Sequence, residues 1–168
     1  TIISLFEAYF YYTNLLQSEK EKEELIRINL QSKLDSLKSQ VNPHFLFNSL
    51  NTLSSLIAKD AVKAEIFVEE MSNVYRFLLR KNEHELISLE DELEFINSYV
   101  HLLTTRFGKN LQVEFKIDEA YLDYKLPALT LQLLIENAVK HNIITEEIPL
   151  TIRIFTTLSD RLHVVNNL

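Results

Sequence analysis

Apolar residues recur at helical spacing on both sides of a single proline, Pro43. The two series are Leu30, Leu34, Leu37 and Val41 before it, and Leu46, Leu50, Leu53 and Ile57 after it. Steps of three and four residues are typical of a helix that buries one face against another helix. Because five residues separate the end of the first series from the start of the second, the two stripes are out of phase. We therefore expect one long helix over about residues 9–57, kinked near Pro43.

His44 lies where the two stripes change phase. At about 100° per residue, its side chain falls roughly 160 to 240° from each member of the second stripe and within about 40° of a polar line. That line consists of Asn48, Asn51 and Ser55. Because neutral imidazole is a good nucleophile near neutral pH, two readings stay open. His44 is either a surface histidine beside a kink or an exposed nucleophile, with Asn48, one turn along, as the nearest group to orient the ring.

A second amphipathic helix is expected after a short connection. Asp60 suits its N-cap, and the helix should run to about Arg80. Its apolar stripe consists of Phe67, Met71, Val74 and Leu78. A lone antiparallel pair of helices cannot enclose its apolar face, so two copies should pair into a four-helix bundle. We therefore expect a homodimer, and we assign the stripe and Tyr75 to its core rather than to catalysis.

The second half of the chain mixes helices with strands. Ser88 and Asp91 form a capping box for a helix to about Thr105, which Gly108 is placed to end. A half-buried strand is predicted by the alternation of Leu111, Val113, Phe115 and Ile117. A further helix is expected to open at Pro127, with its body over residues 128–141. Strands are expected over 150–156 and from 162 onward. Together these elements make an α+β second domain.

Two pairs of polar residues stand at the i,i+4 spacing on the predicted 128–141 helix: Glu136 with Lys140, and Asn137 with His141. One reading is a surface ion pair beside a histidine that the helix dipole favours near the C-terminus. The other reading is a ligand site, because an amide carbonyl is a neutral oxygen ligand suited to Mg²⁺ bound with nucleotide phosphates.

The composition excludes several classes of protein. The chain has no cysteine, so it has neither a disulfide nor a thiolate metal site. Its formal net charge of -7 argues against direct binding of nucleic acid, which depends on a basic face. The apolar, aromatic segment 1–16 contains Glu7 and is shorter than the roughly 20 residues that cross a bilayer. It also has no basic n-region, so it is not a signal peptide.

Residues 40–51, which read QVNPHFLFNSLN, resemble the phosphoacceptor segment of the LytS/YehU-type sensor histidine kinases, membrane-anchored sensors of bacterial two-component systems. The likeness continues, in the family's order from about residue 30 to 168, through segments 75–78, 89–93, 106–107 and 134–142. The resemblance implies a mainly α chain in which a dimeric helical hairpin precedes a partial GHKL-type ATP-binding domain.

The resemblance also implies a division of the chain and a location. Residues 1–28 would be a juxtamembrane signalling helix, residues 29–82 the dimerisation and histidine phosphotransfer hairpin, and residues 83–168 the partial ATP-binding domain. The family's glycine-rich lid is not in the sequence, which has one glycine. We therefore expect a fragment of a longer kinase, inactive by itself because its ATP pocket is incomplete. The fragment would be the cytoplasmic portion of a bacterial inner-membrane protein, anchored through a region before Thr1.

By the same resemblance, His44 would accept the γ-phosphoryl group of ATP and pass it to an aspartate of a response regulator. Residues 134–142 would be the N box, in which Asn137 binds Mg²⁺ between the ATP phosphates. Glu136 would orient water or the attacking group. Two further side chains, those of Lys140 and His141, would face the phosphates.

One motif departs from the family. Asn166 stands where the adenine-binding aspartate is expected, and Leu168 where glycine is expected. An asparagine carbonyl can still accept a hydrogen bond from the adenine amino group, without the charge assistance of a carboxylate. The departure supports an alternative, a non-catalytic dimeric adaptor with a degenerate nucleotide site. A third reading, a coiled-coil scaffold without nucleotide, leaves the order of the C-terminal motifs unexplained.

Overall fold

The computed structural model describes residues 14, 17–30, 42–80, 86–158 and 161–167. The chain divides into two units, Thr1–Asn42 and Pro43–Leu168. In the first unit, residues 17–30 are helical and exposed along their whole length. Residues 9–13, 15–16 and 31–41 of the predicted long helix lie outside the described residues. Within those residues, no helix is long and apolar enough to span a bilayer.

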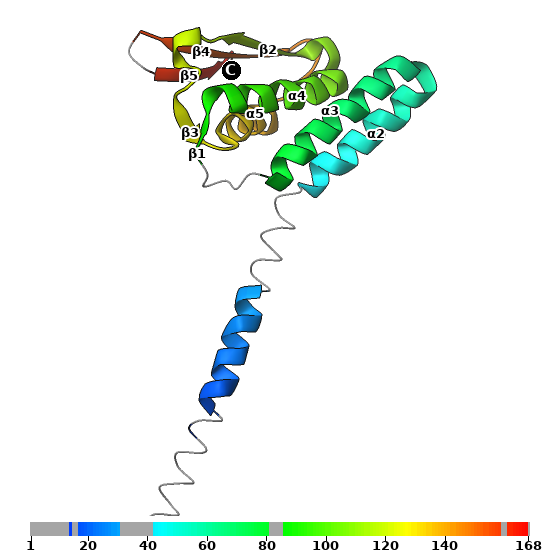
Figure 1. Ribbon diagram of the computed structural model, residues 1–168. Coiled ribbons are helices and arrows are strands. Elements are labelled where there is room, and N and C mark those ends of the chain that lie inside the picture. Colours follow the sequence, from blue (N-terminus) through cyan, green and yellow to red (C-terminus); the bar gives the residue numbers. More distant parts are fainter. Residues whose placement is uncertain (1–13, 15–16, 31–41, 81–85, 159–160, 168) are drawn as a thin grey trace, which may run out of the picture. The chain divides into compact units, whose positions relative to one another are not determined.

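The second unit begins with a helical hairpin made of α2 (Pro43–Lys59) and α3 (Ala61–Arg80) (Figure 1). The expectation of one helix running through Pro43 is wrong, because Asn42 is not helical and α2 starts at the proline. The physical reason is local. A proline disfavours helical backbone in the residue before it, and its missing N–H costs nothing at the first position of a helix.

The predicted cap and stripe of the second helix are confirmed. The Lys63 backbone N–H donates to Asp60 Oδ1 over 3.1 Å, so the aspartate caps α3 as expected. Phe67, Val74 and Leu78 are buried, and Met71 is half-buried. The stripe therefore forms the core side of α3.

The rest of the unit is an α/β arrangement, so the structure is mainly helical with small sheets, in agreement with the expected mixed class. Its elements are β1 (Leu86–Ser88), α4 (Leu89–Phe107), η1 (Gly108–Asn110), β2 (Leu111–Lys116), η2 (Glu119–Tyr121), β3 (Lys125–Pro127), α5 (Thr130–His141), β4 (Leu150–Thr157) and β5 (Arg161–Asn166). One sheet has the order β2-β4-β5, with β2 parallel and β5 antiparallel to β4. A short antiparallel pair joins β1 to β3.

The ends of α4 follow the sequence signals. The Asp91 backbone N–H donates to Ser88 Oγ over 3.1 Å, which confirms the predicted N-cap. Gly108 ends the helix with a positive φ of 62°, a conformation that glycine adopts without a Cβ penalty. The predicted strands are present as β2, β4 and β5. The pair of β1 and β3 was not predicted.

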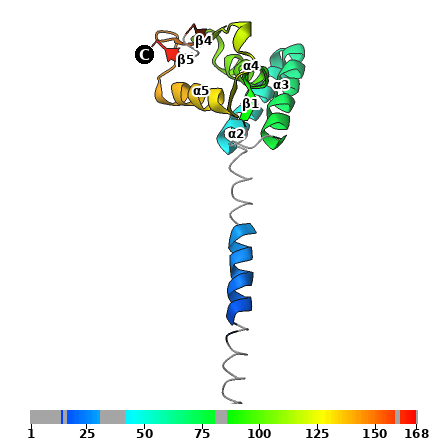
Figure 2. The same cartoon turned by 60° about the vertical axis from the view of Figure 1, so that its left-hand side comes forward.

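Helix α4 lies between the hairpin and α5, and it joins the two halves of the unit (Figure 1, Figure 2). It contacts α3 on one side and α5 on the other, while α5 packs on the central strand β4. The inward side chains of β4 are fully buried, as are those that α5 turns toward the core: Leu150, Ile152, Ile154, Leu131 and Ile135. This shared core fixes the position of α5, the helix that carries the predicted N box.

Candidate functional site

His44 is the second residue of α2, and its ring is exposed. Asn48 lies one turn along, and its Nδ2 is 3.1 Å from His44 Nε2 and 3.3 Å from Nδ1. An amide N–H only donates, so a ring nitrogen in this contact acts as the acceptor. The structure therefore presents an accessible imidazole with an oriented partner, as the i,i+4 spacing suggested.

The residue after His44, Phe45, points toward the protein interior. Phe45 is half-buried, and its ring stacks on that of Tyr99 in α4, with centroids 5.1 Å apart and an interplanar angle of 28°. A second aromatic contact places Tyr99 beside Phe95, at 6.3 Å. The first turn of α2 is thus packed on α4 by Phe45 while His44 stays in solvent.

Helix α5 carries the four predicted N-box side chains, and the structure separates them into two groups. Asn137, Lys140 and His141 are exposed, whereas Glu136 is half-buried. Glu136 makes no ion pair with Lys140 in the part of the chain that the structure describes. The reading of these residues as a surface ion pair therefore finds no support in the geometry.

Glu136 is held by two donors that the sequence did not reveal. Its Oε1 accepts from Tyr99 Oη over 2.9 Å and from Gln132 Nε2 over 2.8 Å. Burial raises the pKa of Tyr99, and the Glu136 carboxylate raises it further, so the hydroxyl stays protonated and donates. Gln132 stands four residues before Glu136 on the same helix, so the i,i+4 spacing could have identified it as a partner from the sequence. No such spacing links Tyr99 to Glu136.

The start of α5 corrects the prediction that the helix opens at Pro127. Pro127 ends β3, Leu129 has a left-handed backbone with a φ of 67°, and α5 begins at Thr130. No side chain of the segment itself caps the helix. Instead, the Glu92 carboxylate accepts from the backbone N–H of Leu129 over 2.9 Å and from that of Leu131 over 2.8 Å. A carboxylate from another helix thus satisfies the first donors of α5.

Glu92 is fully buried, and burial raises its pKa, while the two backbone N–H donors lower it. Glu92 was not among the site residues predicted from the sequence. Its spacing was the signal, because it lies three residues after Leu89 and three before Phe95, on the buried face of α4. A carboxylate at a core position of a helix implies a partner elsewhere in the fold.

Asn166 is the last residue of β5 and is exposed, opposite Ile152 of β4. The side chain of the next residue, Asn167, makes two hydrogen bonds to backbone groups. Its Oδ1 accepts from the Thr151 N–H over 2.9 Å, and its Nδ2 donates to the Pro149 carbonyl over 3.0 Å. Leu168 lies outside the described residues.

The donor set on α5 fits a magnesium nucleotide better than a metal ion bound by protein alone. Among the described residues, no group of three His, Asp or Glu side chains is placed to hold a metal. Asn137 offers a neutral amide oxygen, and Lys140 and His141 lie three and four residues further along the same helix. Such a set suits Mg²⁺ that takes most of its ligands from phosphates and water.

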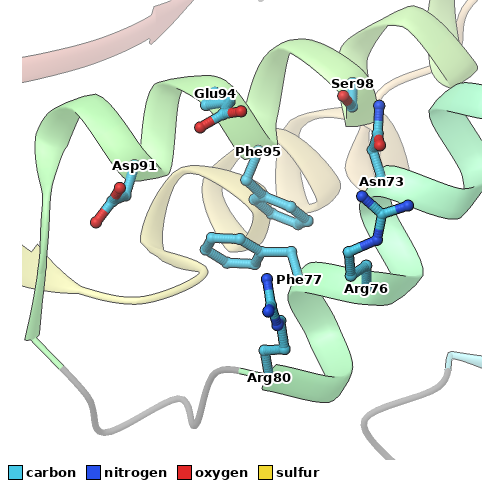
Figure 3. Close-up of a pocket in the computed structure, with 8 residues that line it drawn as sticks. All are labelled: Asn73, Arg76, Phe77, Arg80, Asp91, Glu94, Phe95 and Ser98. Atoms are coloured by element: carbon cyan, nitrogen blue, oxygen red, sulfur yellow. The ribbon is translucent and has the colours of Figure 1, made fainter.

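A separate cavity of about 250 Å³ lies between α3 and α4 (Figure 3). Its floor is the stacked pair Phe77 and Phe95, whose centroids are 4.3 Å apart. It is lined by Asn73, Arg76, Phe77, Arg80, Asp91, Glu94, Phe95 and Ser98. None of these residues belongs to the predicted phosphotransfer set, so the cavity is distinct from it.

Comparisons with known proteins point to one family. A family model described as "Histidine kinase" matches residues 32–111. The sensor histidine kinase BtsS of Escherichia coli K12 is 41% identical over 125 residues, which cover 74% of this chain and 21% of that protein. The sensor protein LytS of Enterococcus faecalis is 36% identical over 121 residues, or 72% of this chain and 20% of that protein.

A third relative, the sensor histidine kinase/phosphatase LytS of Staphylococcus aureus strain Mu50, is 32% identical over 121 residues, or 72% of this chain and 21% of that protein. The chain therefore spans about a fifth of the length of the curated relatives that it matches.

Proposed function

We propose, on the premise that this chain belongs to the LytS/YehU-type family of sensor histidine kinases, that His44 is the phosphoacceptor of a two-component sensor kinase. In the full-length protein, ATP would phosphorylate His44, and the phosphoryl group would then pass to an aspartate of a response regulator. The observation that carries the proposal is the exposed His44 ring beside Asn48 at the start of a packed helix.

The reaction needs one free ring nitrogen. Its lone pair would attack the γ-phosphorus, the bond from phosphorus to the ADP oxygen would break, and the proton on the other ring nitrogen would pass to water. Asn48 keeps the ring oriented by its amide contact. Glu136 would orient the attacking group, since a carboxylate accepts a proton or a hydrogen bond.

The nucleotide would be held by α5 and β5. Asn137 would bind Mg²⁺, which neutralises the charge of the phosphates when bound. Lys140 and His141 would face the phosphates, and Asn166 would accept from the adenine amino group. The exposure of all four side chains supports this assignment.

We also propose that residues 29–82 form a four-helix bundle with a second copy of the chain, between a signalling helix over 1–28 and an ATP-binding part over 83–168. The support is a set of large apolar side chains that the hairpin leaves exposed: Phe47, Leu50, Ile57, Val62, Ile66 and Val68. Their exposure is costly in a monomer, because large apolar patches favour association. By family, the kinase would be anchored in the bacterial inner membrane with this portion in the cytoplasm.

A non-catalytic dimeric adaptor is the second candidate. It is favoured by Asn166, a neutral amide where the family has a carboxylate, and by Leu168, which stands where the family has glycine. The neutral amide would weaken adenine binding, because hydrogen bonds to a charged acceptor are the stronger ones.

Labelling of the full-length protein with γ-³²P ATP and Mg²⁺ separates the two candidates. We expect acid-labile label in the wild type and none in His44→Ala. His101→Ala, which removes an exposed histidine of α4, is the matched control and should be labelled like the wild type. An unlabelled wild type would support the adaptor, and label that persists in His44→Ala would place the phosphoacceptor elsewhere.

A further inference from the structure

Tyr99 stands between the segment that carries His44 and the Glu136 side chain. Its ring is buried, with 3% of its surface exposed, and it stacks on Phe45. Its hydroxyl leaves this aromatic cluster and donates to Glu136 Oε1. One residue of α4 therefore touches both the neighbour of the proposed phosphoacceptor and the proposed catalytic carboxylate.

Both hydrogen bonds to the Glu136 carboxylate reach the same oxygen. Tyr99 Oη and Gln132 Nε2 both donate to Oε1, while Oε2 accepts from no other group in the described part of the chain. Two donors on one oxygen fix the rotation of the carboxylate about its last bond. The second oxygen then remains available to a group outside the protein core.

The arrangement around Gln132 carries a cost. Its Oε1 is buried and has no hydrogen-bond partner among the described residues. An unpaired buried acceptor is unfavourable, and a flipped amide would instead bring two oxygens together at Glu136. The Glu136 carboxylate therefore orients the Gln132 amide, and the Gln132 carbonyl oxygen is left without a hydrogen bond among the described residues. A cost of this kind is expected where a side chain is held for function rather than for stability alone.

We propose that Tyr99 is a positioning residue for the phosphoryl transfer, which fixes the Glu136 carboxylate through its hydroxyl. The inference rests on the proposed function, because Glu136 has a role only if His44 is phosphorylated. Packing against Phe45 and Phe95 holds the tyrosine ring, so its hydroxyl reaches Glu136 without loss of side-chain freedom during the reaction.

The test uses Tyr99→Phe in the full-length kinase, a change that keeps the ring and removes the hydroxyl. The rate of acid-labile labelling at saturating ATP should fall about tenfold or more, while the KM for ATP stays within about twofold. A merely structural tyrosine would not separate these two constants. Gln132→Met removes the second donor at similar size, so it should lower the same rate and leave the KM for ATP in place.

The matched control is Tyr75→Phe. The Tyr75 hydroxyl is buried and has no partner in the described residues, so its loss should leave rate and KM as in the wild type. If the wild type is labelled on His44 and Tyr99→Phe keeps its rate within twofold, the inference fails and the proposed function stands. If the wild type takes no label at His44, the proposed function fails and the inference falls with it.

Discussion

Replacing Glu92 by glutamine should destabilise the chain, because the Glu92 carboxylate caps α5. In the wild type, each carboxylate oxygen accepts one backbone N–H at the start of α5, over 2.8 and 2.9 Å. The amide of glutamine has one acceptor oxygen, so its NH₂ group would face the remaining N–H. One charge-assisted hydrogen bond is lost, and a buried donor is left unpaired.

Hydrogen bonds to charged groups contribute about 1.5–3 kcal/mol each, and an unpaired buried donor costs about 1–3 kcal/mol. Relief from burying a charge offsets part of this loss, since burial disfavours the ionised form of Glu92. We therefore expect Glu92→Gln to lower the free energy of unfolding by about 2–4 kcal/mol at neutral pH. The loss of structure should be confined to the start of α5, because the first backbone N–H groups of that helix would lose their acceptor.

The pH dependence has a definite sign. Burial raises the pKa of Glu92 above its ordinary value of 4.5, so the folded chain binds this proton more tightly than the unfolded chain. The contribution of Glu92 to stability therefore falls as pH rises from 4.5 through the raised pKa. Urea unfolding of the wild type on both sides of this window measures the change.

Urea unfolding of the 168-residue chain, followed by far-UV circular dichroism, gives the free energy of unfolding for both proteins. Amide hydrogen exchange should show faster exchange at Leu129 and Leu131 in the variant. Glu94→Gln, an exposed change on the same helix, is the matched control and should stay within about 0.5 kcal/mol. A Glu92→Gln protein as stable as this control, with protection at both amides intact, would refute the capping argument.

Two further changes test the local signals. Gly108→Ala should lower the free energy of unfolding by about 1–3 kcal/mol in the same urea assay. An added Cβ meets no atom within 4 Å, so a lower stability would reflect the positive φ. An unchanged stability would contradict that explanation. Asp60→Asn tests the cap of α3. The Lys63 backbone N–H and side chain lower the pKa of Asp60, so the wild type should lose this stabilisation as pH falls from the ordinary range through the lowered pKa. The stability difference between wild type and Asp60→Asn should shrink over that range, and a constant difference would show that the carboxylate is not the cap.

The features predicted correctly from sequence are those whose cause lies within a few residues. Asp60, Ser88 and Gly108 end or begin helices through contacts with their own segments, so each could be found from spacing alone. The contact of Asn48 with His44 is of the same kind, because it joins residues one helical turn apart. Alternation found β2, because its side chains alternate between exposed positions and buried or half-buried ones.

The features missed depend on distant partners. The true start of α5 is set by Glu92, which lies 37 residues before Leu129 and 39 before Leu131. Tyr99 is likewise 37 residues before Glu136. The strands β1 and β3 have three residues each, too few to show alternation. In each case the decisive partner is brought close by tertiary packing, which no local pattern encodes.

The parallel pairing of β2 with β4 also sets an order of events during synthesis. The central strand of the sheet can pair only after β3 and α5 have been made, whereas α2 and α3 are joined through Asp60 alone. Longer loops cost more entropy to close, and distant pairings slow folding. On the ribosome, the hairpin that bears His44 therefore emerges and closes first, and the sheet is completed last.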